Sequence, residues 1–211
     1  MRKFTLNQIV EIQAGLVLSR TGAKQLELIK RNVAEKVSDI IVRKYKVITL
    51  RSITDVGILD LSQCDDFDSK EEISDRYLTH KNDILVRMFT PLKCCLINSE
   101  EENLVVPSQF CILKLKESFR NIILPEYLYL VMCNKDFSKQ VQKLEEGFQL
   151  RSIKTSSIAK IKINIPDIAT QEKLINVSNL IIRKEKLMSE LIIQEKLYNE
   201  AILEKLIKGE I

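Results

Sequence analysis

Positively charged side chains carry the most informative chemistry in this sequence, because they fall into two stretches of the chain. Residues 1–59 hold 11 Lys/Arg and 5 Asp/Glu, and residues 139–162 hold 6 and 2. Between them, residues 60–75 hold seven acidic side chains and one lysine. Two basic stretches on one domain can form a basic face, which suits a polyanion partner. The alternative is an ordinary surface of mixed charge, which the small net charge of +4 favours when taken alone.

Catalytic chemistry has little support in the sequence. His80 is the only histidine; Asp75 and Asp83 flank it, and no nucleophile lies at a recognisable spacing, so we interpret it as a surface residue. The acidic run "DDFDSKEE" lacks the glycine and the spacing of a calcium loop and is interpreted as a solvated loop. The sequence has no P-loop, no (N/D)PP(Y/F) motif and no Gly-rich methyl-donor loop. We therefore predict no catalytic residue and no metal site.

The cysteines and the apolar pattern limit the class of protein further. The five cysteines include no C-x-x-C pair, and their number is odd, so we predict reduced and mostly buried thiols. No apolar run reaches 18 residues, and the first residues lack the apolar core of a signal peptide. We expect a cytoplasmic protein with no membrane segment.

The elements that must position the basic residues are mostly strands. Segments rich in Val, Ile, Tyr and alternating apolar residues predict strands in "DIIVRKYKVITLRSI", "NDILV", "KCCLI", "QFCILKLK" and "IAKIKINIP". The segment 125–147 predicts one helix, because Pro125 suits a first helical position and Gly147 a C-terminal stop. Residues 1–166 are therefore predicted to form a strand-rich α/β (α+β) domain.

The C-terminal segment is different, because 42 residues follow Pro166 before the next glycine or proline at Gly209. Thr170 is a plausible N-cap, and apolar residues then recur at steps of three, four or seven. A helix of about 40 residues would be about 60 Å long. It is too long to bury its apolar stripe on its own domain, so we expect it to need a partner helix.

Two rows of the predicted helix suggest how it pairs. Each row contains one charge, and the rows are Val177, Lys184, Leu191 and Tyr198, and Ile181, Met188, Glu195 and Ile202. Parallel self-pairing would oppose identical charges, whereas antiparallel pairing opposes Lys184 to Glu195. We therefore predict an antiparallel coiled coil; the alternative is that both charges simply face solvent.

Six segments together resemble the specificity subunit of type I restriction-modification systems. In chain order they are "LNQIVEIQAGLVLSRTG", "VITLRSITDVGILD", "LTHKNDILVRMFTP", "VVPSQFCILKLK", "ILPEYLYLVMCN" and "GFQLRSIKTSSIAKIKINIPDIATQEKLI". Two local departures are Asn82, where the family has glycine, and "IPDIATQ", which is less rich in Pro and Leu. The larger departure is length, because the family's usual chain carries two recognition domains and two spacer helices, and this sequence shows one of each.

The resemblance implies a target-recognition domain over residues 1–166 and a conserved spacer and dimerisation helix over residues 167–208. Two copies, or this chain and another half-length subunit, would then restore the usual layout and read two inverted half-sites. Lys and Arg would contact phosphates, and Arg, Asn or Gln would read base edges. The side chains that we expect to contact DNA are Arg20, Lys24, Arg43, Lys44, Arg87, Lys93, Gln149, Arg151 and Lys154. Tyr45 and Phe148 could stack on bases or pack in the core.

By the same resemblance, the partners are double-stranded DNA, methyltransferase subunits that methylate adenine, and a restriction subunit. S-adenosylmethionine, ATP and Mg would be used by those subunits, and this chain would hold no cofactor. The alternative function is a coiled-coil adaptor that does not bind DNA.

Overall fold

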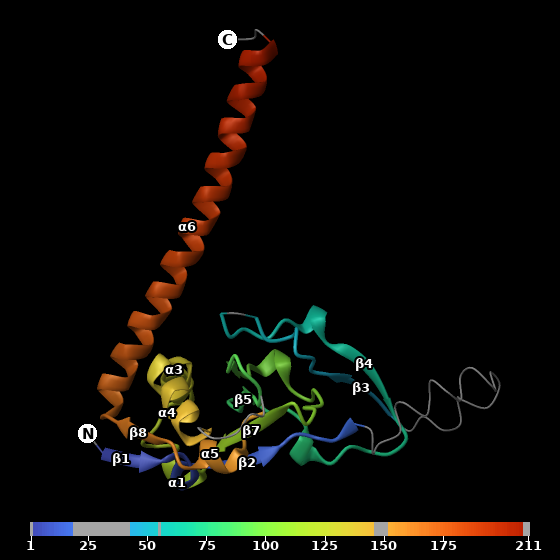
Figure 1. Cartoon of the computed structure of the whole chain (residues 1–211), viewed down its shortest axis with the longest axis vertical. Coiled ribbons are helices and arrows are strands. Elements are labelled where there is room, and N and C mark those ends of the chain that lie inside the picture. Colours follow the sequence, from blue (N-terminus) through green and yellow to red (C-terminus); the bar gives the residue numbers. More distant parts are fainter. Residues whose placement is uncertain (1, 19–42, 55, 146–151, 209–211) are drawn as a thin grey trace, which may run out of the picture. The chain divides into compact units, whose positions relative to one another are not determined.

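A computed structural model of the protein describes residues 2–18, 43–54, 56–145 and 152–208. The chain separates into two compact units, Met1–Ile168 and Ala169–Ile211, and each is described by itself. The first is a mixed unit of strands and short helices, and the second is one long helix (Figure 1). This is the strand-rich α/β class followed by a C-terminal helix that the sequence predicts.

A four-stranded antiparallel sheet forms the centre of the first unit. Its strands, in spatial order, are β2 (Val10–Ala14), β7 (Phe110–Leu115), β5 (Ile84–Arg87) and β6 (Cys94–Leu96). In β7, Cys111, Ile112 and Leu113 are all buried, because both faces of this central strand are covered. Only Lys114 and Leu115, at its end, are partly exposed.

A second ribbon carries the acidic segment. Strand β3 (Arg43–Val47) pairs antiparallel with β4 (Asp65–Ser69), so that Lys44 lies opposite Asp68 and Lys46 opposite Asp66. The prediction of a solvated loop for "DDFDSKEE" is therefore wrong for its first half. Cross-strand pairing of opposite charges favours a strand here, and Phe67 supplies the buried position between the carboxylates.

A separate two-stranded sheet pairs the first strand of the unit with its last strand. Strand β1 (Arg2–Thr5) pairs with β8 (Lys162–Ile165), the last strand before Pro166. Ile161, Ile163 and Ile165 are buried, as the alternating pattern predicts. The helices α1 (Leu6–Ile9) and α5 (Thr155–Ala159) precede β2 and β8, and the short 3-10 turns are η2 (Leu61–Gln63), η3 (Asp75–Tyr77), η4 (Ser99–Glu101) and η5 (Glu117–Phe119).

The predicted single helix over residues 125–147 is in fact two helices, α3 (Pro125–Cys133) and α4 (Lys135–Glu145). Pro125 is at the start of α3, as expected. Asn134 has an extended backbone, and its Oδ1 accepts a hydrogen bond from the Asp136 backbone N at 3.0 Å. The Asn134 side chain therefore caps the second helix and offers the backbone an alternative to a continuous helix. Gly147 lies outside the described residues.

Helix α6 (Ile168–Lys208) is continuous over 41 residues and about 60 Å long. It begins two residues before Thr170, directly after Asp167, so Thr170 is not its N-cap. Most of its large apolar side chains are exposed in the single chain, including Val177 at 54%, Met188 at 53% and Leu191 at 58%. Most of the apolar side chains in the predicted stripe are thus exposed to solvent along the described part of the helix.

The five cysteines are all free thiols, and four of them are buried. Burial raises the pKa of Cys111 to about 12 and raises the pKa of Cys95 further. The thiols buried in this way are held in the unreactive protonated form. The prediction of reduced and mostly buried cysteines is confirmed.

Candidate nucleic-acid interface

The fold brings together two of the segments from which we predicted DNA contacts. The turn between β5 and β6, residues 88–93, forms an isolated bridge with the segment after residue 151, through Phe89 and Ser152. Ile153 N donates to Met88 O at 2.8 Å, which ties the two backbones directly. Lys93 is partly exposed on the first segment, and Lys154 is exposed on the second. The structure therefore holds both lysines on neighbouring backbone segments at one end of the central sheet.

Arg87 is the last residue of β5 and lies at the same end of the sheet. Its backbone pairs with Phe110 of β7, and its N donates to Lys93 O at 2.8 Å. The Arg87 side chain is only partly exposed, and its Nε is buried without a hydrogen-bond partner in the described part of the chain. Arg87, Lys93 and Lys154 thus form the basic cluster that the described residues support best.

Strand β3 presents its basic side chains differently. Arg43 and Lys44 are exposed, as expected for DNA contacts, but Arg43 Nη1 lies 2.6 Å from Glu72 Oε1. Lys46 pairs with Asp66 at 3.5 Å across the ribbon. The acidic strand β4 therefore offsets much of the charge on β3, so we expect this ribbon to attract a polyanion less than the basic cluster does.

Tyr45 was left open in the sequence between base stacking and core packing, and the structure places it in the core. Its ring is 9% exposed and lies in a cluster with Phe67 and Leu78. Its hydroxyl accepts a hydrogen bond from Ile73 N at 3.0 Å. The remaining predicted contacts lie outside the described residues and stay predictions: Arg20, Lys24, Phe148, Gln149 and Arg151.

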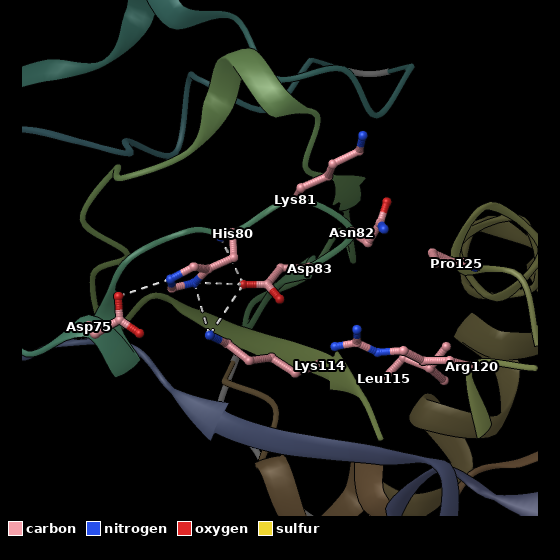
Figure 2. Close-up of a pocket in the computed structure, with 9 residues that line it drawn as sticks. All are labelled: Asp75, His80, Lys81, Asn82, Asp83, Lys114, Leu115, Arg120 and Pro125. Atoms are coloured by element: carbon pink, nitrogen blue, oxygen red, sulfur yellow. Dashed lines mark hydrogen bonds and ion pairs between the residues drawn. The ribbon is translucent and has the colours of Figure 1, made fainter. Parts of the chain in front are cut away.

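A polar cavity of about 450 Å³ lies on another part of the unit, around His80 (Figure 2). His80 Nε2 lies 2.9 Å from Asp75 Oδ1, and Lys114 Nζ lies 3.0 Å from His80 Nδ1. Because the Lys114 ammonium can only donate, His80 Nδ1 accepts its hydrogen bond. His80 Nε2 then carries the ring proton and donates a hydrogen bond to Asp75 Oδ1. His80 lies at the surface, as predicted, with a side chain that is 36% exposed, and it is also a member of this network.

Asp83 is the buried anchor of this network. Its side chain is 6% exposed, and its Oδ2 accepts a hydrogen bond from His80 N at 3.0 Å and lies 3.6 Å from Lys114 Nζ. Burial raises the pKa of Asp83, and the Lys114 charge opposes that rise. Among the described residues, no group of His, Cys, Asp or Glu is arranged to hold a metal ion. The hydrogen bonds between Asp83 and the His80 backbone hold the turn that leads into β5, where Asn82 has a positive φ of 70°.

Comparisons with known proteins agree with this architecture. No protein-family profile matches the chain. Over 101 residues it is 27% identical to the type I restriction enzyme HindI specificity subunit of Haemophilus influenzae, a match over 46% of this chain and 21% of that protein. The HsdS subunit of Thermoanaerobacter tengcongensis superposes with a TM-score of 0.64 at 11% identity, covering 90% of this chain and 44% of that one.

Two further solved structures show the same likeness. One is a chain from a study of complex assembly and conformational transition of the type I R-M system, with a TM-score of 0.65, 12% identity and coverage of 88% and 43%. The other is the S subunit of the type I restriction-modification system from M. genitalium. It superposes with a TM-score of 0.52 at 19% identity and covers 94% of this chain and 44% of that one. This chain has the fold of a type I specificity subunit. It spans less than half the length of the subunits that it matches.

The specificity-subunit fold explains one local departure in the sequence. The family pattern has glycine where this chain has Asn82, and the structure gives Asn82 a left-handed backbone. Asparagine is among the few residues other than glycine that adopt this conformation at small cost. Asn82 can therefore adopt the backbone of this turn without glycine.

In the parts of the chain that the structure covers, no helix is both long enough and apolar enough to span a membrane.

The buried Asp83 predicts a pH dependence of stability with a definite sign. Because the folded state raises the pKa of this carboxyl, it holds the proton more tightly than the unfolded chain does. The contribution of Asp83 to stability should fall as pH rises from about 4, the unfolded value, through the raised folded value. Asp83→Asn removes this titration. We expect urea unfolding to show that wild type loses stability relative to the variant between pH ~4 and ~7.

The matched control is Asp75→Asn, which removes a carboxylate that contacts the same imidazole but has a side chain that is 80% exposed. It provides the baseline for losing one charge from the His80 network. A difference between wild type and Asp83→Asn that stays constant across this pH range would contradict the predicted shift.

Proposed function

We propose that this chain is a DNA sequence-recognition subunit of a type I restriction-modification complex. It directs adenine methylation and restriction to a specific, split DNA site. The observation that carries the proposal is the likeness to specificity subunits over 88–94% of the chain, which includes both the strand-rich unit and the long helix. The sequence similarity to the HindI specificity subunit of Haemophilus influenzae supports it independently.

In this proposal the strand-rich unit binds double-stranded DNA. The basic cluster of Arg87, Lys93 and Lys154 supports this role, because three cationic side chains lie on adjoining segments at one end of the sheet. Lysines that neutralise phosphates release counterions and make affinity depend on salt. Arg43 and Lys44 take part as secondary contacts, since β4 offsets their charge.

The chain works as half of a recognition unit. It covers 43–44% of the solved specificity subunits, and its one long helix carries an apolar stripe that is exposed in the single chain. A second copy, or another half-length subunit, covers this stripe through an antiparallel coiled coil in which Lys184 faces Glu195. Both side chains are exposed in the single chain, so both can reach a partner helix.

The chain itself catalyses no reaction in this proposal. Methyltransferase subunits with S-adenosylmethionine modify adenine, and a restriction subunit with ATP and Mg cleaves DNA, all in the cytoplasm. What supports a non-catalytic role is the His80 network: its carboxylates and Lys114 are used to hold one another, and it includes no serine, cysteine or threonine nucleophile.

The direct test of this function is co-expression with a cognate methyltransferase subunit, followed by genome-wide mapping of methylated adenines. We expect methylation at one split, palindromic motif that disappears when this chain is omitted. Methylation without a motif, together with no duplex binding at low salt, would instead favour the coiled-coil adaptor.

The role of the basic cluster predicts a change in salt dependence. In Lys93→Gln/Lys154→Gln, two phosphate contacts are lost, so the slope of log K against log salt should become shallower by about two. Fluorescence anisotropy with a labelled duplex at several salt concentrations measures the slope. Lys81→Gln/Lys135→Gln removes the same charge from exposed residues outside the two basic stretches and should leave the slope nearly unchanged. Equal slopes for all three proteins would exclude these lysines from the interface.

The antiparallel helix pairing predicts a charge-reversal rescue. Lys184→Glu places two acidic side chains opposite each other, and Glu195→Lys places two lysines there. Each single change should weaken self-association about 10-fold, and the double exchange should restore it. Sedimentation of the full chain over a concentration series measures the dimer constant. Single variants that associate as well as wild type would show that the two charges face solvent.

A further inference from the structure

We propose that Arg87 is a specificity-determining residue that reads a guanine through its guanidinium, rather than one of the residues that bind phosphate. This inference rests on the proposed function and deepens it, because it assigns a base-reading role to one side chain of the basic cluster. It comes from three observations: the position of Arg87 in the sheet, its partial burial, and a buried Nε that has no hydrogen-bond partner among the described residues.

The placement of Arg87 is rigid. It is the terminal residue of a strand in the middle of the four-stranded sheet, next to the fully buried Phe110 of β7. Its backbone N is held by Lys93 O, and the next residue, Met88, is bonded to Gln109 O and to Ile153 N. Base reading needs this property, because a side chain can select a base only if its donors hold a fixed position.

The burial of Arg87 is unusual for a cation. Its Nε is buried and has no hydrogen-bond partner among the described residues. The exposed arginines Arg43 and Arg120 behave differently, because each contacts a carboxylate, at 2.6 Å and 2.9 Å respectively, and has a side chain more than half exposed. A buried donor that lacks an acceptor is unfavourable, so a small rearrangement of Arg87 that brings its guanidinium to an acceptor on DNA would be favoured.

The geometry of the Arg87 guanidinium donors indicates which acceptor they suit. With its backbone fixed by the sheet, Arg87 can offer a pair of parallel N–H donors, which match O6 and N7 of guanine in the major groove. A phosphate could also accept them, but phosphate contacts need no paired donors and suit the lysines Lys93 and Lys154. Arg87 is the residue of the cluster whose donor geometry can select a base.

The experiment maps methylated adenines in cells that express a cognate methyltransferase subunit with wild-type chain, Arg87→Gln or Arg87→Lys. We expect both variants to accept other bases at one guanine position of the motif and to keep the remaining positions. Discrimination at that position should fall about 10- to 100-fold. Arg87→Lys belongs in the expectation because it keeps the charge and loses the paired donors.

Arg120→Gln is the matched control, since it removes the same charge from an exposed arginine outside the basic cluster, and it should leave the motif unchanged. A phosphate contact would instead leave the motif intact in Arg87→Gln and lower methylation equally at all sites, with partial rescue in Arg87→Lys. That outcome would overturn the inference, as would an unchanged methylation pattern. If the wild-type chain directs no motif, the proposed function itself has failed.

A purely structural role for Arg87 is tested in the same proteins by thermal unfolding. Because the buried Nε of Arg87 has no acceptor in the described part of the chain and so does not stabilise the free fold there, Arg87→Gln should unfold at the wild-type temperature or above it. A marked loss of stability in both variants, with methylation lost in proportion, would assign Arg87 to the fold and reject the base-reading role.

Discussion

The central constraint on this molecule is that a 41-residue helix cannot bury its apolar side chains within one short chain. Val177, Met188 and Leu191 are each more than half exposed, and they recur at the spacing of a helical stripe. Exposed apolar rows of this length are favourable only when another helix covers them. The proposed two-fold layout and the proposed reading of a split site both depend on this one requirement.

The strand-rich unit provides what the helix cannot, which is a rigid support for loops. Strands β5 and β7 are buried on both faces, so the ends of these strands hold fixed positions. The turn after β5 and the segment before α5 are joined there by a bridge between Phe89 and Ser152. Binding residues are often found on loops that a rigid sheet positions, and here that arrangement concentrates three cations at one end of the sheet.

Positive charge is not spread evenly over the described part of the unit. Strand β4 and Glu72 offset the cations of β3, whereas the buried Nε of Arg87 has no hydrogen-bond partner in the described structure. The net charge of +4 hides this division. In the proposed function, the basic cluster attracts DNA and Arg87 makes the more selective contact there.

The sequence by itself determined the fold class, the strands β5, β7 and β8, and the long helix, because these depend on local apolar periodicity and on the positions of Pro125 and Pro166. It could not show that Asn134 divides one helical pattern into two, that the acidic run forms a strand, or that Tyr45 lies in the core. Each of these outcomes depends on partners that are distant along the chain, such as β3 for the acidic run and Ile73 for Tyr45. The grouping of Arg87 with Lys154 was likewise decided only by the tertiary structure, since backbone pairing across the sheet end brings together residues that no local pattern connects.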